Sequence, residues 1–281
     1  MKSKLILSLG AAAATLVAAP SVVTAQAAAP GYHVIHRINA GGEGGWDYIT
    51  VDPESNRLFL SRGTHAMVID LGRDSVIGDI PNTLGIHGVA LAPELNRGFT
   101  SNGRDSSVTI FDYKTLATIA VVKIPGRNPD AILYDPATKR VFTFNGGSSN
   151  STAIDATNGK VLGTVELGGK PETAVSEGGK IYANIEDKSE IAVFDPATQL
   201  AFTSNGEGSI TVVHEDTPDK YTVVETVPTQ RGARTMAVNP KTHRLYTVSA
   251  EFGPAPAPTA DRPRPRPPMI PGTFVVLELD R

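Results

Sequence analysis

The stretch WDYITVDPESNRLFLSRG, residues 46–63, holds two short apolar runs on either side of an Asp-Pro turn. Four later stretches align with it without gaps, at residues 86–103, 129–146, 189–206 and 233–250. Each repeats the alternating run, a turn at Asp-Pro, Ala-Pro or Asn-Pro, and a second run, and proline presets the φ that such a turn needs. The pattern predicts a recurring antiparallel pair of strands.

Three of these stretches end in Asn-Gly, a dipeptide that favours a tight hairpin into a third strand. Two more strand-like runs follow, as in SVTIFD (residues 107–112) and TIAVVKIP (residues 118–125), before a glycine-rich joint. Four short strands repeated about every 40 residues are the signature of a β-propeller blade. We therefore predict an all-β propeller with strands of about 5–6 residues and almost no helix.

The second strands share a motif that reads LFLSRG, GFTSNG, VFTFNG, IYANIE, AFTSNG and LYTVSA along the chain. In this motif the sequence resembles the YVTN-repeat proteins, specifically the exported YncE-like propellers. The resemblance covers nearly all of the chain after its leader. It implies a periplasmic or surface propeller, seven-bladed in that family, and it implies no particular reaction.

The spacing of the turns breaks once. Pro53, Pro93 and Pro136 are 40 and 43 residues apart, and Gly178 takes the equivalent place 42 residues later. Pro196 then follows after only 18 residues. Between a half and one and a half blades are therefore missing near Asp187.

The shortened region holds six strands, between residues 172 and 227, where two blades need eight. The run Ile191–Phe194 fits either a third strand of the earlier blade or a first strand of the later one. We expect about five nearly complete blades and one defective blade, all within a single domain of residues 28–281.

The two ends of the chain predict a closure. Residues after Arg234 supply only three strands, and YHVIHRINAGG (residues 32–42) has the pattern of an outer strand, so the N-terminal strand is expected to complete the last blade and cover its edge. A Pro-rich insertion, residues 253–272, favours an extended loop. It is either a tolerated hairpin insertion or a partner-binding arm that carries Arg262, Arg264 and Arg266.

An ionisable residue stands five positions before the first residue of every turn. The first strand of a propeller blade lines the central channel, so these residues are predicted to form a ring in water at one channel mouth. The ring consists of Asp47, His87, Asp130, Glu172, Glu190 and Arg234. Trp46, the only tryptophan, either stacks on a ligand at this mouth or belongs to the core.

The ring suggests a binding function. Carboxylates with an imidazole suit a divalent cation such as Ca²⁺, Mg²⁺ or Zn²⁺, and the candidate ligands are Asp47, His87, Asp130 and Glu172. Arg234 would orient an anionic ligand. The alternative is that the ring only solvates the channel mouth.

We therefore expect a binding protein for a small ligand, a metal or a protein partner at the channel mouth. The alternative is a metal-assisted, lactonase-like hydrolase that uses the channel carboxylates, although no serine lies in a nucleophile motif and no catalytic residue is assigned. The chain carries a formal net charge of −3 without a basic cluster, so no nucleic-acid partner is expected. The absence of cysteine excludes disulfides, thiolate metal sites and c-type haem. We expect a monomer.

Residues 1–27 have the pattern of a cleaved secretory signal. Lys2 and Lys4 precede an apolar stretch, and Ala25-Gln26-Ala27 forms a small-residue cleavage site. No later segment approaches the roughly 20 apolar residues that a membrane span needs. The sequence thus predicts a periplasmic or secreted protein without a membrane span after cleavage.

N-terminal sequencing of the protein isolated from its producing cells should give a start near Ala28, because cleavage follows the small-residue site. A cytoplasmic product that retains Met1 would contradict the prediction of a cleaved signal.

Overall fold

The computed structural model describes residues 31–177, 179–185, 193–195, 200–217, 220–259, 265 and 267–281. Residues Gly31–Arg281 form one compact unit. The unit is built from antiparallel strands, and the helical element among the described residues is one 3₁₀ turn, η1 (Pro93–Leu95). The predicted signal peptide, Glu190 and the three arginines of the Pro-rich loop lie outside the described residues.

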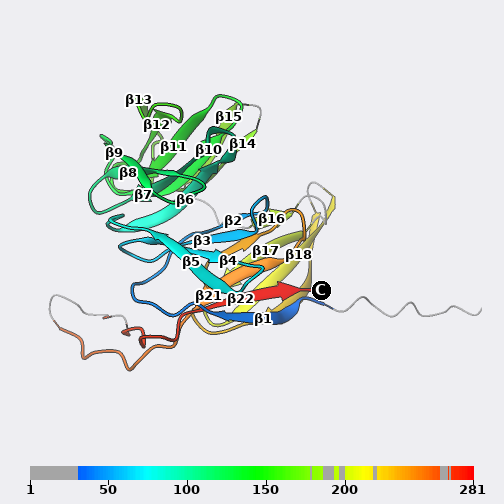
Figure 1. Ribbon diagram of the computed structural model, residues 1–281. Coiled ribbons are helices and arrows are strands. Elements are labelled where there is room, and N and C mark those ends of the chain that lie inside the picture. The colour runs from blue at the N-terminus through cyan, green and yellow to red at the C-terminus, as the bar shows by residue number, and fades with distance from the viewer. Residues whose placement is uncertain are drawn as a thin grey trace, which may run out of the picture. The chain divides into compact units, whose positions relative to one another are not determined.

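Five sheets have four strands each, and four of them are formed by strands that follow one another in the chain (Figure 1). The first two consist of β2 (Ile49–Asp52), β3 (Arg57–Ser61), β4 (Ala66–Asp70) and β5 (Ser75–Ile80), and of β6 (Ile86–Ala92), β7 (Arg97–Asn102), β8 (Ser107–Asp112) and β9 (Thr118–Lys123). The next two consist of β10 (Pro129–Asp135), β11 (Arg140–Asn145), β12 (Asn150–Asp155) and β13 (Val161–Glu166), and of β16 (Val193–Asp195), β17 (Leu200–Asn205), β18 (Ser209–Thr217) and β19 (Lys220–Pro228).

The fifth sheet joins the two ends of the chain. It has the order β1–β22–β21–β20, with β20 (Met236–Val238), β21 (Leu245–Ser249), β22 (Val275–Asp280) and β1 (His33–Asn39). Strand β1 pairs antiparallel with β22 from His33↔Asp280 to Asn39↔Val275. The predicted closure by the N-terminal strand is confirmed.

The sixth sheet has only two strands, β14 (Pro171–Glu177) and β15 (Lys180–Ile185), and we call it the half-blade. It is the defective blade that the broken spacing predicts, so the prediction of five complete blades and one defective blade is confirmed. Strand β16 pairs with β17, which assigns Val193 and Phe194 to the first strand of the later blade. The six strands expected between residues 172 and 227 are β14 to β19.

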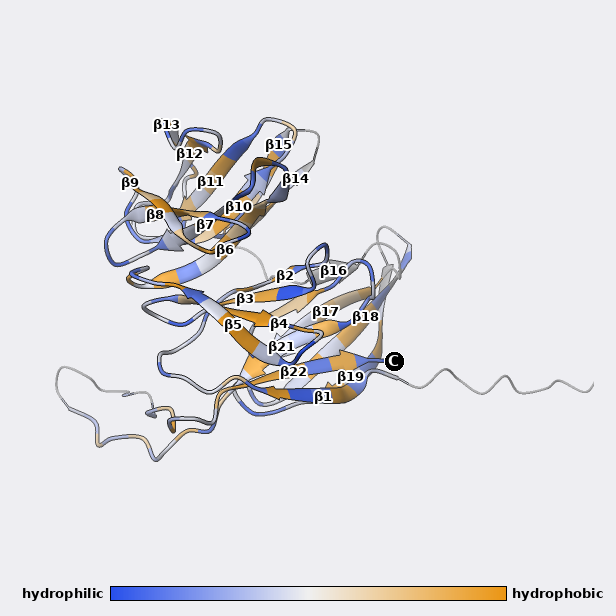
Figure 2. Cartoon of the chain, in the orientation of Figure 1, coloured by the Kyte–Doolittle hydropathy of each residue, from blue (hydrophilic) through white to orange (hydrophobic). Residues whose placement is uncertain are grey.

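The first strands of the blades are neighbours around the axis. Strand β10 packs on both β6 and β14, β2 packs on β6 and β20, and β16 packs on β20. Central strands such as β3 and β4 are buried, whereas the outermost strand β9 is mostly exposed. Hydrophobic residues occur in both kinds of strand (Figure 2). Along the described ranges, no helix has the length and apolar character needed to cross a membrane.

Buried side chains between consecutive blades hold the sheets together. An aromatic residue occupies the same register position in the second strand of each blade, opposite Thr50, Ala90 or Ala237 in the first strand. In four complete blades these aromatic residues are at most 2% exposed: Phe59, Phe99, Phe202 and Tyr246. Phe59 packs on Phe111 of the next blade, with ring centroids 6.1 Å apart.

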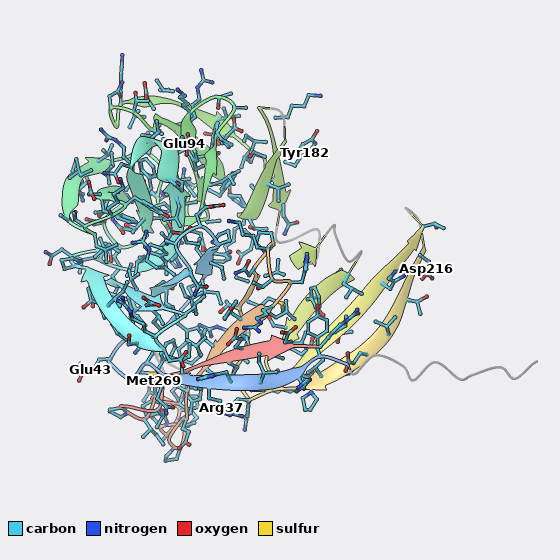
Figure 3. The ribbon with its side chains drawn as sticks, turned by 45° about the vertical axis from the view of Figure 1, so that its right-hand side comes forward. Arg37, Glu43, Glu94, Tyr182, Asp216 and Met269 are labelled. Carbon is cyan, nitrogen blue, oxygen red and sulfur yellow. The ribbon has the colours of Figure 1, made fainter. Side chains whose placement is uncertain are left out.

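The half-blade is the exception to this packing. Its aromatic residue, Tyr182, pairs with Val175, and these side chains are 52% and 63% exposed (Figure 3). Phe142, the equivalent residue of the preceding blade, is only partly buried. The missing strands therefore leave apolar surface uncovered among the residues described at this point of the propeller.

The Asn-Gly pairs do not form the tight hairpins that the sequence analysis predicts. Gly103 and Gly146 have no positive φ, and the left-handed residues of these loops are Ser106 and Ser149. The amide of Asn102 is instead buried and donates to Ser107 and Thr109 at the start of the third strand, at 3.0 and 2.9 Å. The prediction was wrong because the buried amide network, rather than the turn type, selects asparagine here.

The same network recurs in two other blades. Asn145 donates to Asn150 and Thr152, and Asn205 donates to Ser209 and Thr211, at 3.0–3.1 Å. Buried polar atoms need hydrogen-bond partners. This network supplies them at the loop between the second and third strands of each of these blades.

Replacing the aromatic residue of the second strand should lower the free energy of unfolding much more in a complete blade than in the half-blade. Phe99→Ala is expected to lower the free energy of unfolding by about 3–5 kcal/mol because it opens a cavity in the core. Tyr182→Ala should cost less than about 1 kcal/mol because the side chain is half exposed. Urea unfolding followed by circular dichroism measures both values, and equal losses would contradict the proposed difference in packing.

Candidate functional site at the channel mouth

Three residues of the predicted ring lie together. Asp47 precedes β2, His87 lies in β6 and Asp130 lies in β10, so they come from the first strands of three consecutive blades. His87 Nδ1 lies 2.7 Å from Asp47 Oδ2 and 3.5 Å from Asp130 Oδ1. One ligand atom from each of the three residues lies within 4.8 Å of the others. We call these residues the Asp-His-Asp cluster.

Backbone contacts between blades fix the cluster. The backbone N–H of Asp47 donates to Ser61 Oγ at 2.7 Å, and Tyr48 N–H donates to the carbonyl of His87 at 3.0 Å. Ser101 Oγ accepts from Gly88 N–H at 3.0 Å and donates to the carbonyl of Asp130. Serines of the second strands thus tie each first strand in place.

The second nitrogen of His87 also has a defined environment. The side chain of Asn128 hydrogen-bonds the imidazole, and its Oδ1 lies with His87 Nε2 against Gly103. A Cβ at position 103 would come within 2.5 Å of Asn128 Oδ1 and 2.6 Å of His87 Nε2. The glycine is therefore needed for this close approach of the Asn128 amide oxygen and His87 Nε2.

The carboxyl of Asp130 has an unusually high pKa. Burial raises its pKa to about 6; the charges of His87 and Lys170 oppose the rise, and those of Glu172 and Asp47 add to it. Its side chain is only 13% exposed. The sequence analysis placed the ring charges in water, and for Asp130 that expectation was wrong because neighbouring strands cover the carboxyl.

The pKa of His87 is shifted by the neighbouring carboxylates. Burial acts to lower its pKa, but the hydrogen bond with Asp47 and the charges of Asp130 and Asp47 outweigh burial and raise the pKa above its usual value. These partners thus stabilise the protonated imidazole relative to a free histidine.

Glu172, on β14, is connected to the cluster through Tyr48. The Tyr48 hydroxyl donates to the carbonyl of Glu172 at 2.9 Å and to its Oε1 at 3.1 Å, and Lys170 Nζ lies 3.9 Å from its Oε2. Burial, together with the charges of Glu172, Asp130 and Asp47, raises the pKa of the Tyr48 hydroxyl. Tyr48 therefore remains a neutral donor that bridges the first complete blade and the half-blade.

Arg234 contacts the backbone beside the cluster instead of its carboxylates. Its Nη2 donates to the carbonyl of Trp46 at 3.0 Å, and its guanidinium lies 5.7 Å from the centre of the Trp46 ring. Trp46 is 7% exposed and packs on Phe274 at 5.3 Å, so it belongs to the core as well as to a pocket wall. Glu190, the sixth predicted ring member, lies outside the described residues.

Sequence reasoning missed Tyr48, Asn128 and the serines of the second strands. Tyr48 directly follows a ring residue, and Asn128 stands two residues before one, so proximity along the chain was an available signal. Their roles depend on contacts between different blades, which the repeat pattern does not specify.

Solved structures assign the fold. The WD40 repeats of RRP9 match with a TM-score of 0.66 and 7% identity, over 89% of this chain and 97% of that chain. U3-55K matches with a TM-score of 0.65 and 8% identity, over 88% and 98%. Hydrazine synthase of Kuenenia stuttgartiensis matches with a TM-score of 0.48 and 16% identity, over 75% of this chain and 58% of that chain.

Neither a protein-family profile nor a curated protein sequence matches the chain. Such low identities to solved structures define the fold and nothing finer. The protein is a β-propeller.

The stability of the protein should depend on pH through Asp130. The folded state keeps the Asp130 proton up to about pH 6, whereas the unfolded chain loses it near the ordinary value of 3.8, so this group lowers stability as pH rises between the two values. Asparagine has no proton to lose, so Asp130→Asn removes this effect. The free energy of unfolding of the variant minus that of the wild type should therefore be about 2 kcal/mol larger at about pH 7.5 than at about pH 4.5.

Urea unfolding at both pH values measures the difference between the two proteins. His87 acts in the same direction, since its raised pKa stabilises the folded state below about pH 6.5 and the gain is lost as pH rises through the folded pKa. A constant difference between the wild type and Asp130→Asn would show that burial does not hold the carboxyl protonated.

Proposed function

We propose that the protein is an exported, YncE-like β-propeller that binds a divalent cation at its channel mouth. The observation that carries the proposal is the Asp-His-Asp cluster, whose three ligand atoms come from three different blades. The leader sequence supports export, and the shared second-strand motif supports the family assignment.

The spacing of the cluster is close to what a small cation needs. A tetrahedral zinc ion with bonds of about 2.0–2.2 Å holds its ligand atoms about 3.3–3.6 Å apart. The 3.5 Å between His87 Nδ1 and Asp130 Oδ1 matches this separation, whereas the hydrogen-bonded pair of His87 Nδ1 and Asp47 Oδ2, at 2.7 Å, would open as the ion enters. A cation would replace the proton shared by His87 and the carboxylates and would relieve the repulsion between Asp47 and Asp130.

The partner of His87 adds independent support. A histidine that binds a metal usually donates its other ring N–H to an oxygen that orients the ring, and Asn128 occupies that position for Nε2. The imidazole favours Zn²⁺ over Ca²⁺, because calcium takes six to eight oxygen ligands.

Zn²⁺ should bind to the purified protein, treated first with chelator, at about pH 7.5 and much more weakly at about pH 5, because protons compete for His87 and Asp130. Isothermal titration calorimetry and the shift in melting temperature measure binding. Loss of two ligands in Asp47→Asn/Asp130→Asn should abolish it, and Ca²⁺ should give a smaller shift than Zn²⁺.

A matched control is His214→Gln. His214 forms an equally close pair with Asp216, at 2.9 Å, without the arrangement of two carboxylates around Nδ1. This variant should bind Zn²⁺ as the wild type does, whereas His87→Gln should not. Unchanged Zn²⁺ binding in the double aspartate variant would leave only the interpretation that the ring solvates the channel mouth.

A metal-assisted hydrolase is the second candidate. Three protein ligands leave a coordination position for water, which is the arrangement of catalytic zinc sites. Hydrolysis of a lactone by the zinc-loaded protein, abolished by chelator and by Asp130→Asn, would establish it. Zinc binding without hydrolysis would assign the site to binding, for a small molecule or a protein partner held by the cation.

A further inference from the structure

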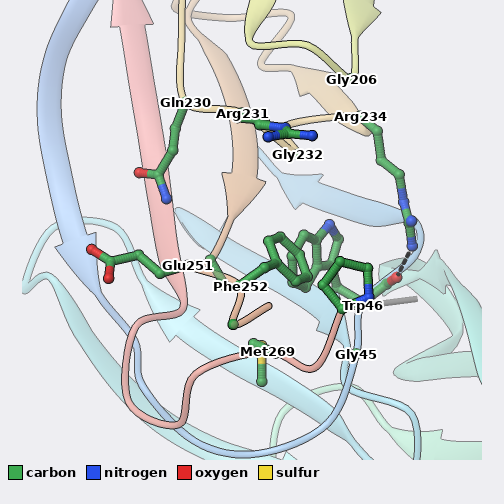
Figure 4. Close-up of a pocket in the computed structure, with 13 residues that line it drawn as sticks. Gly45, Trp46, Gly206, Gln230, Arg231, Gly232, Arg234, Glu251, Phe252 and Met269 are labelled. Atoms are coloured by element: carbon green, nitrogen blue, oxygen red, sulfur yellow. Dashed lines mark hydrogen bonds between the residues drawn. The ribbon is translucent and has the colours of Figure 1, made fainter. Parts of the chain in front are cut away.

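A separate pocket lies on the other side of Trp46. Its volume is about 920 Å³, within the range of small-molecule sites. Four segments line it: the joint before β2, the joint between β19 and β20, the two ends of the Pro-rich loop, and Gly206 in the loop between β17 and β18 (Figure 4). Trp46 represents the first segment, Arg231 and Arg234 the second, and Phe252 and Met269 the third.

The Pro-rich loop builds the apolar wall of the pocket. Its two ends pair at Phe252 and Met269, and Gly253 N–H donates to the carbonyl of Pro268 at 2.8 Å. The Phe252 ring lies 5.9 Å from that of Trp46 and is tilted by 43°. Phe252 nevertheless remains 42% exposed, so a large aromatic surface is open to a ligand.

Two arginines bring positive charge to the pocket, and the guanidinium of Arg234 lies 5.7 Å from the centre of the Trp46 ring. Arg231 and Arg234 both line the pocket and are exposed, and neither forms an ion pair with a carboxylate of the described residues. Arg234 uses one donor on the Trp46 carbonyl. Glu251 also borders the pocket, but its carboxylate lies at the side away from Arg234 (Figure 4).

These groups match the two halves of one kind of ligand. A guanidinium presents paired N–H donors that fit a carboxylate, and two such groups favour an anion strongly. The aromatic rings of the same pocket favour a flat apolar body. Gln230, which also lines the pocket, adds a neutral polar group.

We propose that this pocket binds a small organic anion, a carboxylate with an aromatic or flat apolar body. The carboxylate pairs with Arg231 and Arg234, and the apolar body lies against Phe252 and Trp46. The Pro-rich loop is then part of a ligand site, which differs from both interpretations that the sequence left open. The proposal does not depend on a cation in the Asp-His-Asp cluster.

Trp46 is the only tryptophan and lines the pocket, so its fluorescence reports on binding there. The protein is titrated in chelator with 3-phenylpropionate, and with 3-phenylpropionamide as a neutral probe of the same shape. The carboxylate should change Trp46 fluorescence in a saturable manner and bind about tenfold or more tightly than the amide, because hydrogen bonds between charged groups are stronger than those of a neutral amide.

Arg231→Gln and Arg234→Gln should each weaken binding of the carboxylate about tenfold, and Phe252→Ala should weaken both probes. Arg73→Gln is the matched control, since the Arg73 side chain is 78% exposed in the turn after β4 and does not line the pocket. It should bind as the wild type does. Circular dichroism confirms that each variant is folded.

Three results would overturn the proposal: no saturable change with 3-phenylpropionate up to its solubility limit, equal affinity for acid and amide, or full affinity in the double arginine variant. The variant Asp130→Asn distinguishes the cation site from the pocket. It should lose Zn²⁺ binding and keep 3-phenylpropionate binding, so failure of either proposal is recognised without the other.

Discussion

The packing of one aromatic side chain between neighbouring blades is the interaction on which the rest of the propeller depends. A four-stranded sheet has two faces to bury, and each blade buries them only against the blades before and after it. Phe59, Phe99, Phe202 and Tyr246 fill these interfaces almost without exposure. The first strands meet around the axis because these contacts orient the sheets, and the Asp-His-Asp cluster exists because the first strands meet.

The fold was predictable because its signals are local or periodic. Alternating runs and prolines about 40 residues apart define strand pairs, and one short interval of 18 residues locates the half-blade. The five-residue offset also identified Asp47, His87 and Asp130 as equivalent. The burial of Asp130 and the bridge from Tyr48 to Glu172 could not be predicted, because they depend on which side chains of different blades come into contact.

The error at the Asn-Gly pairs has a similar origin. The dipeptide is compatible with a tight turn, but its amide finds better partners in Ser107 and Thr109. The glycine of the pair is selected at position 103 by the approach of His87 and Asn128. Turn propensity therefore pointed to the right residue types at these positions. The reason for them is the hydrogen bonds of asparagine and the close contacts at glycine, not a tight turn.

A buried arginine links the fold to both proposed sites. Arg62 is fully buried, donates to the carbonyls of Gly41 and Glu43, and lies 3.7 Å from the centre of the Phe274 ring. Burial lowers its pKa to about 10, so it stays charged at neutral pH. It thereby fixes the glycine-rich joint that leads to Trp46 and Asp47, two consecutive residues that serve different sites.

The pairing of β1 with β22 also determines when the protein can finish folding. Strand β1 is synthesised first and its partner last, so the sheet that contains both is incomplete until Asp280 has been made. Contacts between such distant segments form slowly, because closing the long loop between them costs entropy before the contacts form. The closing sheet thus forms only after both of its end segments have been made, and the other blades can form before it does.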